Sequence, residues 1–385
     1  MVFRLNEQQE MIQDTARKFA QREIEPQAAR LDEEGKFCWE IHNKLSELGF
    51  MGMLVPEAYG GMGADAVSYV IAVEELTAAD LSQNMTMTLH NSLVAFPLMA
   101  FGTEEQKRKY LPGLASGKSL GAFALTEPGA GSDAANQETT ARKDGDSWVL
   151  KGNKIFITNG SIADFLLVFA ATDREAGKRG ISCFIVEKET PGFSVTGTEK
   201  KMGINASPTA SLAFEDCRVP ETALLGNPGQ GYEIALKTLD GGRIGIAAQA
   251  VGIAQGALSA SVRYARERKQ FGRPIGEFGA IQNMLADMAT RIDAARLLVY
   301  KAAWMKDEGL PYTRESAECK LYASETCTWV TQCAVQIFGG YGYMKEYPVE
   351  RRYRESKVTE IYEGTSEIQR LVIAHSLLKN GTGKE

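Results

Sequence analysis

A short segment near the end of the chain, Thr359–Arg370, has the residue types of an acid–base site. It reads Thr-Glu-Ile-Tyr-Glu-Gly-Thr-Ser-Glu-Ile-Gln-Arg, so the carboxylate of Glu363 directly precedes Gly364. An apolar helical pattern begins at Ile368, and Gly364 or Thr365 can cap that helix. The pattern therefore predicts that Glu363 lies on a short loop at a helix N-terminus. A carboxylate held there can serve as a base, although an exposed capping glutamate has the same local sequence.

The start of this helix also offers groups that suit an anion. Free backbone N–H groups at a helix N-terminus can bind an anionic ligand or stabilise a developing oxyanion. Glu367 falls in the first turn, where the helix dipole favours negative charge.

A second candidate is the glycine-rich stretch Leu125-Thr-Glu-Pro-Gly-Ala-Gly-Ser-Asp133, which follows a predicted strand. Thr126 and Ser132 supply hydroxyls, and Gly129 and Gly131 allow close backbone approach. Such a loop can receive a phosphate or the edge of a flat ring. It lacks the Gly-x-Gly-x-x-Gly spacing and a surrounding βαβ unit, which argues against a Rossmann domain. A plain turn is the alternative.

Two further patterns are compatible with a planar cofactor. Phe156-Ile157-Thr158 ends a strand with an aromatic and a hydroxyl two residues apart, although ordinary alternation gives the same pattern. The stretch Gln336-Ile-Phe-Gly-Gly340 ends a long helix, and Gly342 follows it. Helix termination explains the first of these three glycines better than all of them.

Basic residues gather around Gln270-Phe271-Gly272, and they form either a phosphate clamp or a solvated helix face. The cluster consists of Arg263, Arg266, Arg268, Lys269 and Arg273.

Earlier in the chain, Asp240-Gly241-Gly242-Arg243 places an arginine at an expected helix start, behind two residues that have no side chain. That arrangement leaves room for a ligand to pass.

The periodicity of apolar residues divides the chain into three predicted domains. Residues 1–120 are helical, with a capping-box pattern at Asn6 and Gln9 and a Met-rich core segment from Met85 to Met99. Residues 121–228 form a small β-barrel or sandwich. Residues 229–385 form a four-helix bundle. The expected strands lie at 121–126, 148–158, 165–171, 180–187, 193–198 and 210–219, and the long helices at 243–266, 280–307 and 315–337 with a last helix from 368.

Composition narrows the classes of function. The chain has 385 residues and a net charge of −6, which argues against nucleic acid as a main partner. Its six cysteines form no Cys-x-x-Cys pair, and its three histidines are far apart in sequence, so we expect no metal site. The N-terminal residues lack a signal-peptide pattern, and no apolar run suggests a membrane span. We therefore expect a cytoplasmic protein.

Together, these motifs resemble the acyl-CoA dehydrogenase family. Leu-Thr-Glu-Pro-Gly-Ala-Gly-Ser-Asp, Phe-Ile-Thr-Asn-Gly, Arg-Lys-Gln-Phe-Gly, Gln-Ile-Phe-Gly-Gly and Ile-Tyr-Glu-Gly-Thr follow in the family's order and spacing, from about residue 5 to the C-terminus. Within the family, the chain is most similar to short-chain (butyryl-CoA) dehydrogenases, because of Leu239–Ala247 and Asn91-Ser-Leu93.

The resemblance implies a fold of three parts, usually assembled as a homotetramer, with FAD between the β domain and the bundle. It implies FAD contacts at Phe123, Leu125, Thr126, Gly131, Ser132, Phe156, Ile157, Thr158, Thr365, Ser366 and Glu367. It implies contacts to a neighbouring subunit's FAD at Arg268, Phe271, Gln336, Ile337, Gly339 and Gly340. Ser132, Asp240, Gly241, Gly242, Arg243 and Gly364 would contact acyl-CoA. Relatives often carry glutamine where this chain has Gly279.

The implied reaction is α,β-dehydrogenation of a short-chain acyl-CoA to trans-2-enoyl-CoA, as in fatty-acid β-oxidation. Glu363 would remove the weakly acidic α proton, and the β-hydride would pass to flavin N5. An electron-transferring flavoprotein would be the electron acceptor. Branched, cyclic or dicarboxylic thioesters remain alternatives, as does a non-catalytic acyl-CoA-binding protein. The chain length argues against a related flavin oxidase, and Glu at position 363 argues against a nitroalkane oxidase, which carries Asp there.

Overall fold

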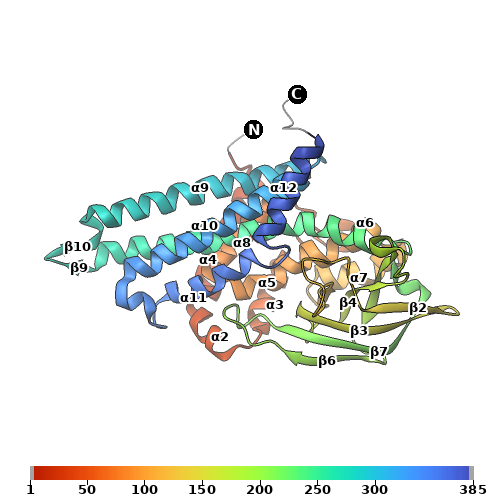
Figure 1. Ribbon diagram of the computed structural model, residues 1–385. Helices are drawn as coiled ribbons and strands as arrows, with labels where there is room; N and C mark the ends of the chain where they lie inside the picture. Colours follow the sequence, from red (N-terminus) through yellow and green to blue (C-terminus); the bar gives the residue numbers. More distant parts are fainter. Residues whose placement is uncertain (1–3, 381–385) are drawn as a thin grey trace.

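The computed structural model describes residues 4–380, so the predictions for residues 1–3 and 381–385, at the ends of the first and last expected domains, lie outside it. Two groups of helices pack side by side along most of the molecule, and a β-sheet region lies at one end (Figure 1). This is the predicted fold class, mainly helical with a central β region.

The N-terminal region is helical, as predicted, and its first helix begins with the expected capping box. The Asn6 side chain accepts from the Gln9 N–H, and the Gln9 side chain accepts from the Asn6 N–H. The π-helical turn η5 (His90–Ala95) continues α5 and is fully buried. The α-helices are α1 (Glu7–Phe19), α2 (Ala28–Glu34), α3 (Trp39–Glu47), α4 (Ala66–Ala79), α5 (Leu81–Leu89), α6 (Phe96–Phe101) and α7 (Glu104–Ala115).

The central region is an eight-stranded sheet in the order β6-β7-β3-β2-β4-β5-β8, with β1 paired parallel to β4. The two ends of this order do not pair with each other among the described residues, so the predicted barrel is open. Its strands are β1 (Gly121–Ala124), β2 (Thr140–Asp144), β3 (Ser147–Thr158), β4 (Phe165–Ala171), β5 (Ile181–Glu187), β6 (Phe193–Thr198), β7 (Thr209–Pro220) and β8 (Leu224–Leu225). The sequence pattern missed β2, whose side chains are mostly polar, and β8, which is two residues long.

The C-terminal region contains the expected long helices, but the first is longer than predicted. It also contains a short hairpin of β9 (Lys269–Gln270) and β10 (Arg273–Pro274). The helices are α8 (Gly231–Glu267), α9 (Gly279–Asp307), α10 (Thr313–Phe338), α11 (Pro348–Ser356) and α12 (Ser366–Asn380).

The prediction that Asp240–Arg243 marks a helix start is wrong, because this stretch lies inside α8. Glycine costs about 1 kcal/mol relative to alanine in a helix interior, which made a break at Gly241-Gly242 plausible. Burial outweighs that cost, since α8 is enclosed by neighbouring helices and both glycines are buried. Tertiary packing therefore extends this helix beyond the local preference.

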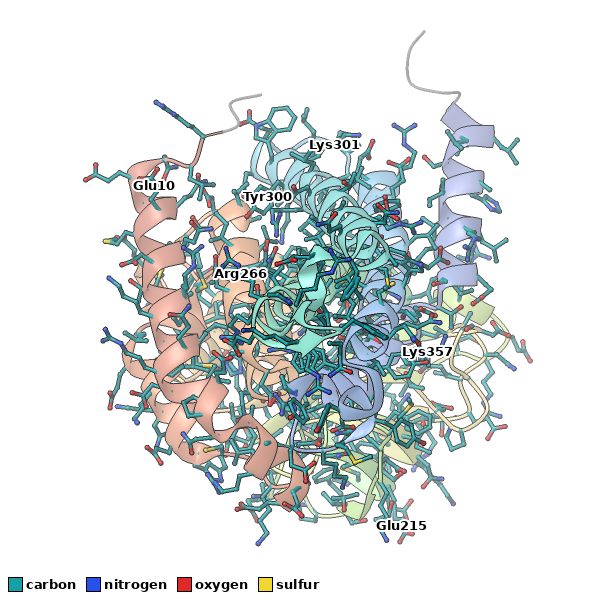
Figure 2. All side chains as sticks on the ribbon, turned by 90° about the vertical axis from the view of Figure 1, so that its left-hand side faces the viewer. Glu10, Glu215, Arg266, Tyr300, Lys301 and Lys357 are labelled. Carbon is teal, nitrogen blue, oxygen red and sulfur yellow. The ribbon has the colours of Figure 1, made fainter. Side chains whose placement is uncertain are left out.

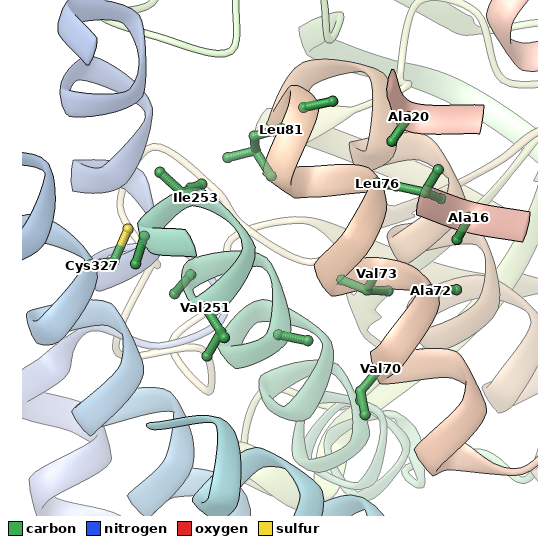
Figure 3. Close-up of a cluster of buried hydrophobic side chains, with 14 of the residues drawn as sticks. Ala16, Ala20, Val70, Ala72, Val73, Leu76, Leu81, Val251, Ile253 and Cys327 are labelled. Carbon is green, nitrogen blue, oxygen red and sulfur yellow. The ribbon is translucent and has the colours of Figure 1, made fainter. Parts of the chain in front are cut away.

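Helix α8 is the central element of the core. It packs between α4 and α10, and Figure 3 shows Val251 and Ile253 of α8 between Val70 and Val73 of α4 and Cys327 of α10. A Cβ built at Gly252 would stand 2.5 Å from the Glu74 carbonyl oxygen, so the close approach of α4 requires glycine there. Within residues 4–380, α8 alone is long and apolar enough to cross a membrane. Burial of 83% of its apolar window inside the protein identifies it as a core helix.

Candidate active site

The loop that carries Glu363 is held in an unusual backbone conformation. Glu363 has φ +53° and Gly364 has φ +97°, so two consecutive residues are left-handed. The Thr365 hydroxyl accepts from the Ile368 N–H at 3.4 Å, which makes Thr365 the cap of α12, one of the two predicted options. A non-glycine residue with positive φ is uncommon and costs free energy, so its surroundings must hold it there.

The carboxylate of Glu363 is buried, although the residue as a whole is partly exposed. Its Oε2 has no hydrogen-bond partner within residues 4–380. Burial raises the pKa of Glu363 to about 7, while the positive charges of Lys320 and Arg243 oppose that rise. A carboxyl group with this pKa exchanges a proton near neutral pH, as a general base must.

Helix α8 passes directly beneath the carboxylate. A Cβ built at Gly242 would lie 2.1 Å from Glu363 Oε2 and 2.9 Å from Leu93 Cδ2 of η5. One turn of α8 therefore has room for the carboxylate only because residue 242 has no side chain. Tyr362, which precedes Glu363, donates to Gln249 Oε1 at 2.5 Å and ties the loop to α8.

An ion pair orders the same turn of α8. Arg243 Nη1 donates to Asp240 Oδ1 at 2.6 Å, and the Thr313 hydroxyl donates to Asp240 Oδ2 at 2.7 Å. Burial raises the pKa of Asp240, and the Arg243 charge lowers it. The structure thus places Asp240, Gly242 and Arg243 on the turn of α8 next to Glu363.

Two donors converge on the carbonyl oxygen of Gly364. Lys320 Nζ, from α10, donates to it at 2.6 Å, and Gln369 Nε2, from α12, donates at 2.8 Å. Gln369 also lies 3.3 Å from the Glu363 carbonyl oxygen. Both side chains have no exposed surface, so the loop is held from two sides by hydrogen bonds that are shielded from water.

The glycine-rich loop is anchored from below by a buried ion pair. Lys154 Nζ donates to Glu127 Oε1 at 2.7 Å and to the Leu125 carbonyl oxygen at 3.0 Å, and Glu127 also accepts from the N–H groups of Glu138 and Thr139. The Thr126 carbonyl oxygen accepts from the Ile155 N–H at 3.0 Å. That bond joins the loop to the end of β3.

The end of β3 presents an aromatic ring outwards. Phe156 has φ +59° and 62% exposure, and a register shift interrupts the pairing of β3 with β7 at this point. Ile157 is buried, so only its backbone remains available to a ligand. The exposed Phe156 ring and the partly buried Thr158 are the groups that could flank a flat molecule.

The residues predicted to contact a neighbouring subunit's FAD lie far from Glu363 in the structure. A groove of about 400 Å³ is lined by Tyr264, Arg268, Gln270, Ile275, Ile337, Phe338, Gly339, Gly340, Tyr341 and Met344. From Lys320, beside Glu363, to Ile337 in this groove is 17 residues of α10, or about 25 Å. Figure 2 views this end of the bundle directly, with Arg266 near its centre. Gln336 and Phe271 do not line the groove, and Phe271 is 94% exposed at the tip beside it.

The residues present fit a bound FAD. Ser366 Oγ is buried without a partner in the described part of the chain, as expected where a ligand supplies the missing bond. Cβ atoms built at Gly131, Gly339 and Gly340 would meet no atom within 4 Å, so these backbones border open space. Ser132 and Glu367 are exposed, whereas Phe123 and Leu125 lie mostly in the apolar core beneath the loop.

Sequence reasoning missed Lys320 and Gln369. A signal for Lys320 exists, because it lies on the small-residue face of α10 with Ala317, Ala323 and Cys327, three and seven residues away. A charged residue on a buried helix face needs a partner, so this pattern indicates a buried polar contact for Lys320. No local pattern identifies that partner as the Gly364 carbonyl.

Comparisons with known proteins agree with this architecture. The N-terminal, middle and C-terminal domains of acyl-CoA dehydrogenases match residues 6–118, 122–217 and 229–378. The short-chain specific acyl-CoA dehydrogenase of Clostridium acetobutylicum is 50% identical, over 98% of this chain and 100% of that protein.

Solved structures are equally similar. Butyryl-CoA dehydrogenase from Megasphaera elsdenii has a TM-score of 0.96 and 48% identity, over 98% of this chain and 100% of that chain. A chain from structural work on the electron transferring flavoprotein of Acidaminococcus fermentans and flavin-based electron bifurcation has a TM-score of 0.97 and 52% identity. That match covers 99% of this chain and 100% of that chain. The chain therefore belongs to the acyl-CoA dehydrogenase family and is a flavin-dependent oxidoreductase.

Proposed function

We propose that this protein converts a straight short-chain acyl-CoA to its trans-2-enoyl-CoA, with Glu363 as the base. The observation that carries the proposal is the buried, unpartnered carboxylate of Glu363, which lies over Gly242 and faces the charges of Lys320 and Arg243. Within residues 4–380, Asp80 and Glu355 also have buried carboxylate oxygens without a hydrogen bond, but their neighbouring charges are Arg351 and Arg352 and they do not lie over Gly242. Asp240 is paired with Arg243, and Glu127 is bonded to Lys154.

The proposed substrate contacts follow from this geometry. The thioester would lie beside the Glu363 carboxylate, with Gly364, Ser132 and the turn of α8 at Asp240–Arg243 along the path of the acyl-CoA. Glu363 Oε2 takes the α proton, and a backbone N–H of the 363–365 loop holds the thioester oxygen as negative charge develops. FAD held here would supply the acceptor for the hydride of the β carbon. A short acyl chain is proposed because the relatives named above are a short-chain specific acyl-CoA dehydrogenase and a butyryl-CoA dehydrogenase.

The chain's own residues would hold FAD from two places. Thr126, Gly131, Ser132, Phe156, Thr158, Thr365, Ser366 and Glu367 would contact the flavin end, together with the backbones of Phe123, Leu125 and Ile157. The groove with Arg268, Ile337, Gly339 and Gly340, and the nearby Phe271 and Gln336, would receive FAD from a neighbouring subunit. A separation of about 25 Å along α10 supports this division, because one compact flavin site cannot use both ends of the helix.

Assembly and partners follow from the same reasoning. We propose a homotetramer, the assembly that the family resemblance implies, in which the groove would receive the cofactor of a second chain. An electron-transferring flavoprotein is the proposed acceptor. The six cysteines form no disulfide, which suits the reducing cytoplasm.

The test is a panel of acyl-CoA thioesters added to the purified yellow protein without oxygen. Butyryl-CoA should bleach the flavin faster than palmitoyl-CoA. The variant Glu363→Gln is nearly isosteric and should stay yellow and bind acyl-CoA, but its bleaching should slow by at least about 10²–10⁴-fold. Bleaching by Glu363→Gln within about tenfold of wild type would place the base elsewhere. Bleaching only by branched, cyclic or dicarboxylic thioesters would replace the substrate class, and no bound flavin at all would leave a non-catalytic binding protein.

A further inference from the structure

Lys320 is a buried ammonium group in the middle of α10. Its side chain has no exposed surface, and within residues 4–380 the carboxylates whose charges act on it, Glu363, Glu360 and Glu367, form no ion pair with it. Lys320 Nζ donates a hydrogen bond to the Gly364 carbonyl oxygen at 2.6 Å. Burying a charge without a paired counter-ion is costly, so a purely structural donor would be better supplied by a neutral group.

A neutral donor is in fact present at the same oxygen. Gln369 Nε2 lies 2.8 Å from the Gly364 carbonyl oxygen, so that carbonyl would keep a hydrogen bond without Lys320. The positive charge is therefore not needed to satisfy the backbone. Its distinguishing feature is its position: it binds the carbonyl of Gly364, the residue after Glu363, and its charge acts on the Glu363 carboxylate.

We propose that Lys320 is a positioning residue for Glu363. Lys320 holds the left-handed 363–364 loop through the Gly364 carbonyl and presents a positive charge to the Glu363 carboxylate. This inference rests on the proposed role of Glu363 as the base. Lys320 itself does not touch the substrate. The backbone at Glu363 is strained, and a short charged hydrogen bond to the next residue is a direct way to hold it.

The other charged and titratable groups around the pair come from every neighbouring element. Arg243 faces both groups from α8, Glu360 and Glu367 face Lys320 from η10 (Lys357–Glu360) and α12, and Tyr69 and Tyr362 adjoin Glu363. Burial lowers the pKa of Lys320 to about 8, and the Glu363 charge raises it. Both groups therefore titrate near neutral pH and each stabilises the charged form of the other.

Four variants separate the effect of the Lys320 charge from the effect of the hydrogen bonds to the Gly364 carbonyl. Lys320→Met removes the charge and the donor with little change in volume, and Lys320→Gln removes the charge. Lys320→Arg keeps the charge. Gln369→Leu is the matched control, because it removes a neutral donor from the same carbonyl oxygen and leaves every charge in place.

Two measurements report on each variant. The first is the pH dependence of flavin reduction by butyryl-CoA, and the second is the infrared carboxyl band of Glu363, identified by its loss in Glu363→Gln. For Lys320→Met and Lys320→Gln we expect both to show the pKa of Glu363 higher by about one unit or more, the usual effect of losing a cation nearby. For Lys320→Arg and Gln369→Leu the pKa should stay within a few tenths of wild type. Loop displacement should slow reduction in Lys320→Met and Gln369→Leu at all pH values.

The infrared measurement keeps this inference separate from the proposed function. If Glu363→Gln remains active, the assignment of the base fails, whatever Lys320 does to the band. If Lys320→Met and Lys320→Gln fold and retain flavin but leave the Glu363 band and the pH profile unchanged, Lys320 is only structural and the inference is overturned. If Lys320→Met does not fold, Lys320→Gln and Lys320→Arg give the same comparison, since they differ in charge while both keep a donor.

Discussion

The carboxylate oxygen Oε2 of Glu363 occupies the space that a side chain at Gly242 would fill, since a Cβ there would lie only 2.1 Å away. The two positions come from different elements, the loop before α12 and the middle of α8. A carboxylate at 363 and a side chain at 242 therefore exclude each other. This relationship explains why α8 has glycine at position 242 in its buried interior.

The first prediction is that Gly242→Ala displaces Glu363 and slows flavin reduction. The protein should fold and stay yellow, because alanine favours helix more than glycine does. A misplacement of about 1 Å can cost on the order of 10²-fold in rate. Gly197→Ala in β6 is the control, since a Cβ there would meet no atom within 4 Å, and its effect should be much smaller. Equal rates for the two variants would show that the space at Gly242 is not needed by the base.

The second prediction concerns pH. Glu363 must be ionised to accept a proton, and burial raises its pKa to about 7. Below that pH the protonated fraction grows, so kcat/KM for butyryl-CoA should fall about tenfold per unit as pH drops from 6 to 5. Above about pH 8, kcat/KM should no longer rise through ionisation of Glu363. Stopped-flow measurement of flavin reduction between pH 5 and 9 gives this pH dependence. A reduction rate that is constant over this range would contradict a base with a raised pKa.

The third prediction is that Arg268→Ala weakens FAD retention in an oligomer. Arg268 lines the groove at the end of the bundle with Gly339 and Gly340, and its guanidinium lies 5.2 Å from the centre of the Tyr341 ring. Arg266→Ala is the control, because Arg266 is exposed two residues earlier and does not line the groove. Flavin content after gel filtration should fall in Arg268→Ala and not in Arg266→Ala. A wild-type monomer that keeps full flavin would contradict a groove filled by a neighbour's cofactor.

The fourth prediction is that Lys154→Met destabilises the protein and loosens the glycine-rich loop. Lys154 and Glu127 are both buried, and removal of one partner leaves the other charge uncompensated, at a cost of about 3–5 kcal/mol in the free energy of unfolding. Denaturant unfolding and the rate of flavin release measure the two effects. The double variant Lys154→Met/Glu127→Leu should recover part of the stability, because no unpaired charge remains. A single variant as stable as wild type would contradict the role of the pair.

Much of the fold was predictable from local pattern. Short β-rich runs between turn residues predicted β4 and β6 with the right bounds and most of β3, β5 and β7. Alternating or continuous apolar runs of this length form few structures other than strands. The capping box at Asn6 was correct for the same local reason. Strand β2 was missed since its polar side chains face solvent, and the start of α8 was misplaced because packing overrides the preference of Gly241 and Gly242.

By itself, the sequence determined the residues of the candidate site that lie in continuous motifs, namely the Glu363 loop, the glycine-rich loop and the end of β3. Tertiary structure alone decided what surrounds the carboxylate. The empty space at Gly242 and the charge of Lys320 come from helices separated from Glu363 by about 120 and 43 residues of chain, so no local spacing records them. Burial, which raises the pKa of Glu363, is likewise a property of the packed helices. Motif order thus identifies the family, and packing sets the chemistry of its proposed base.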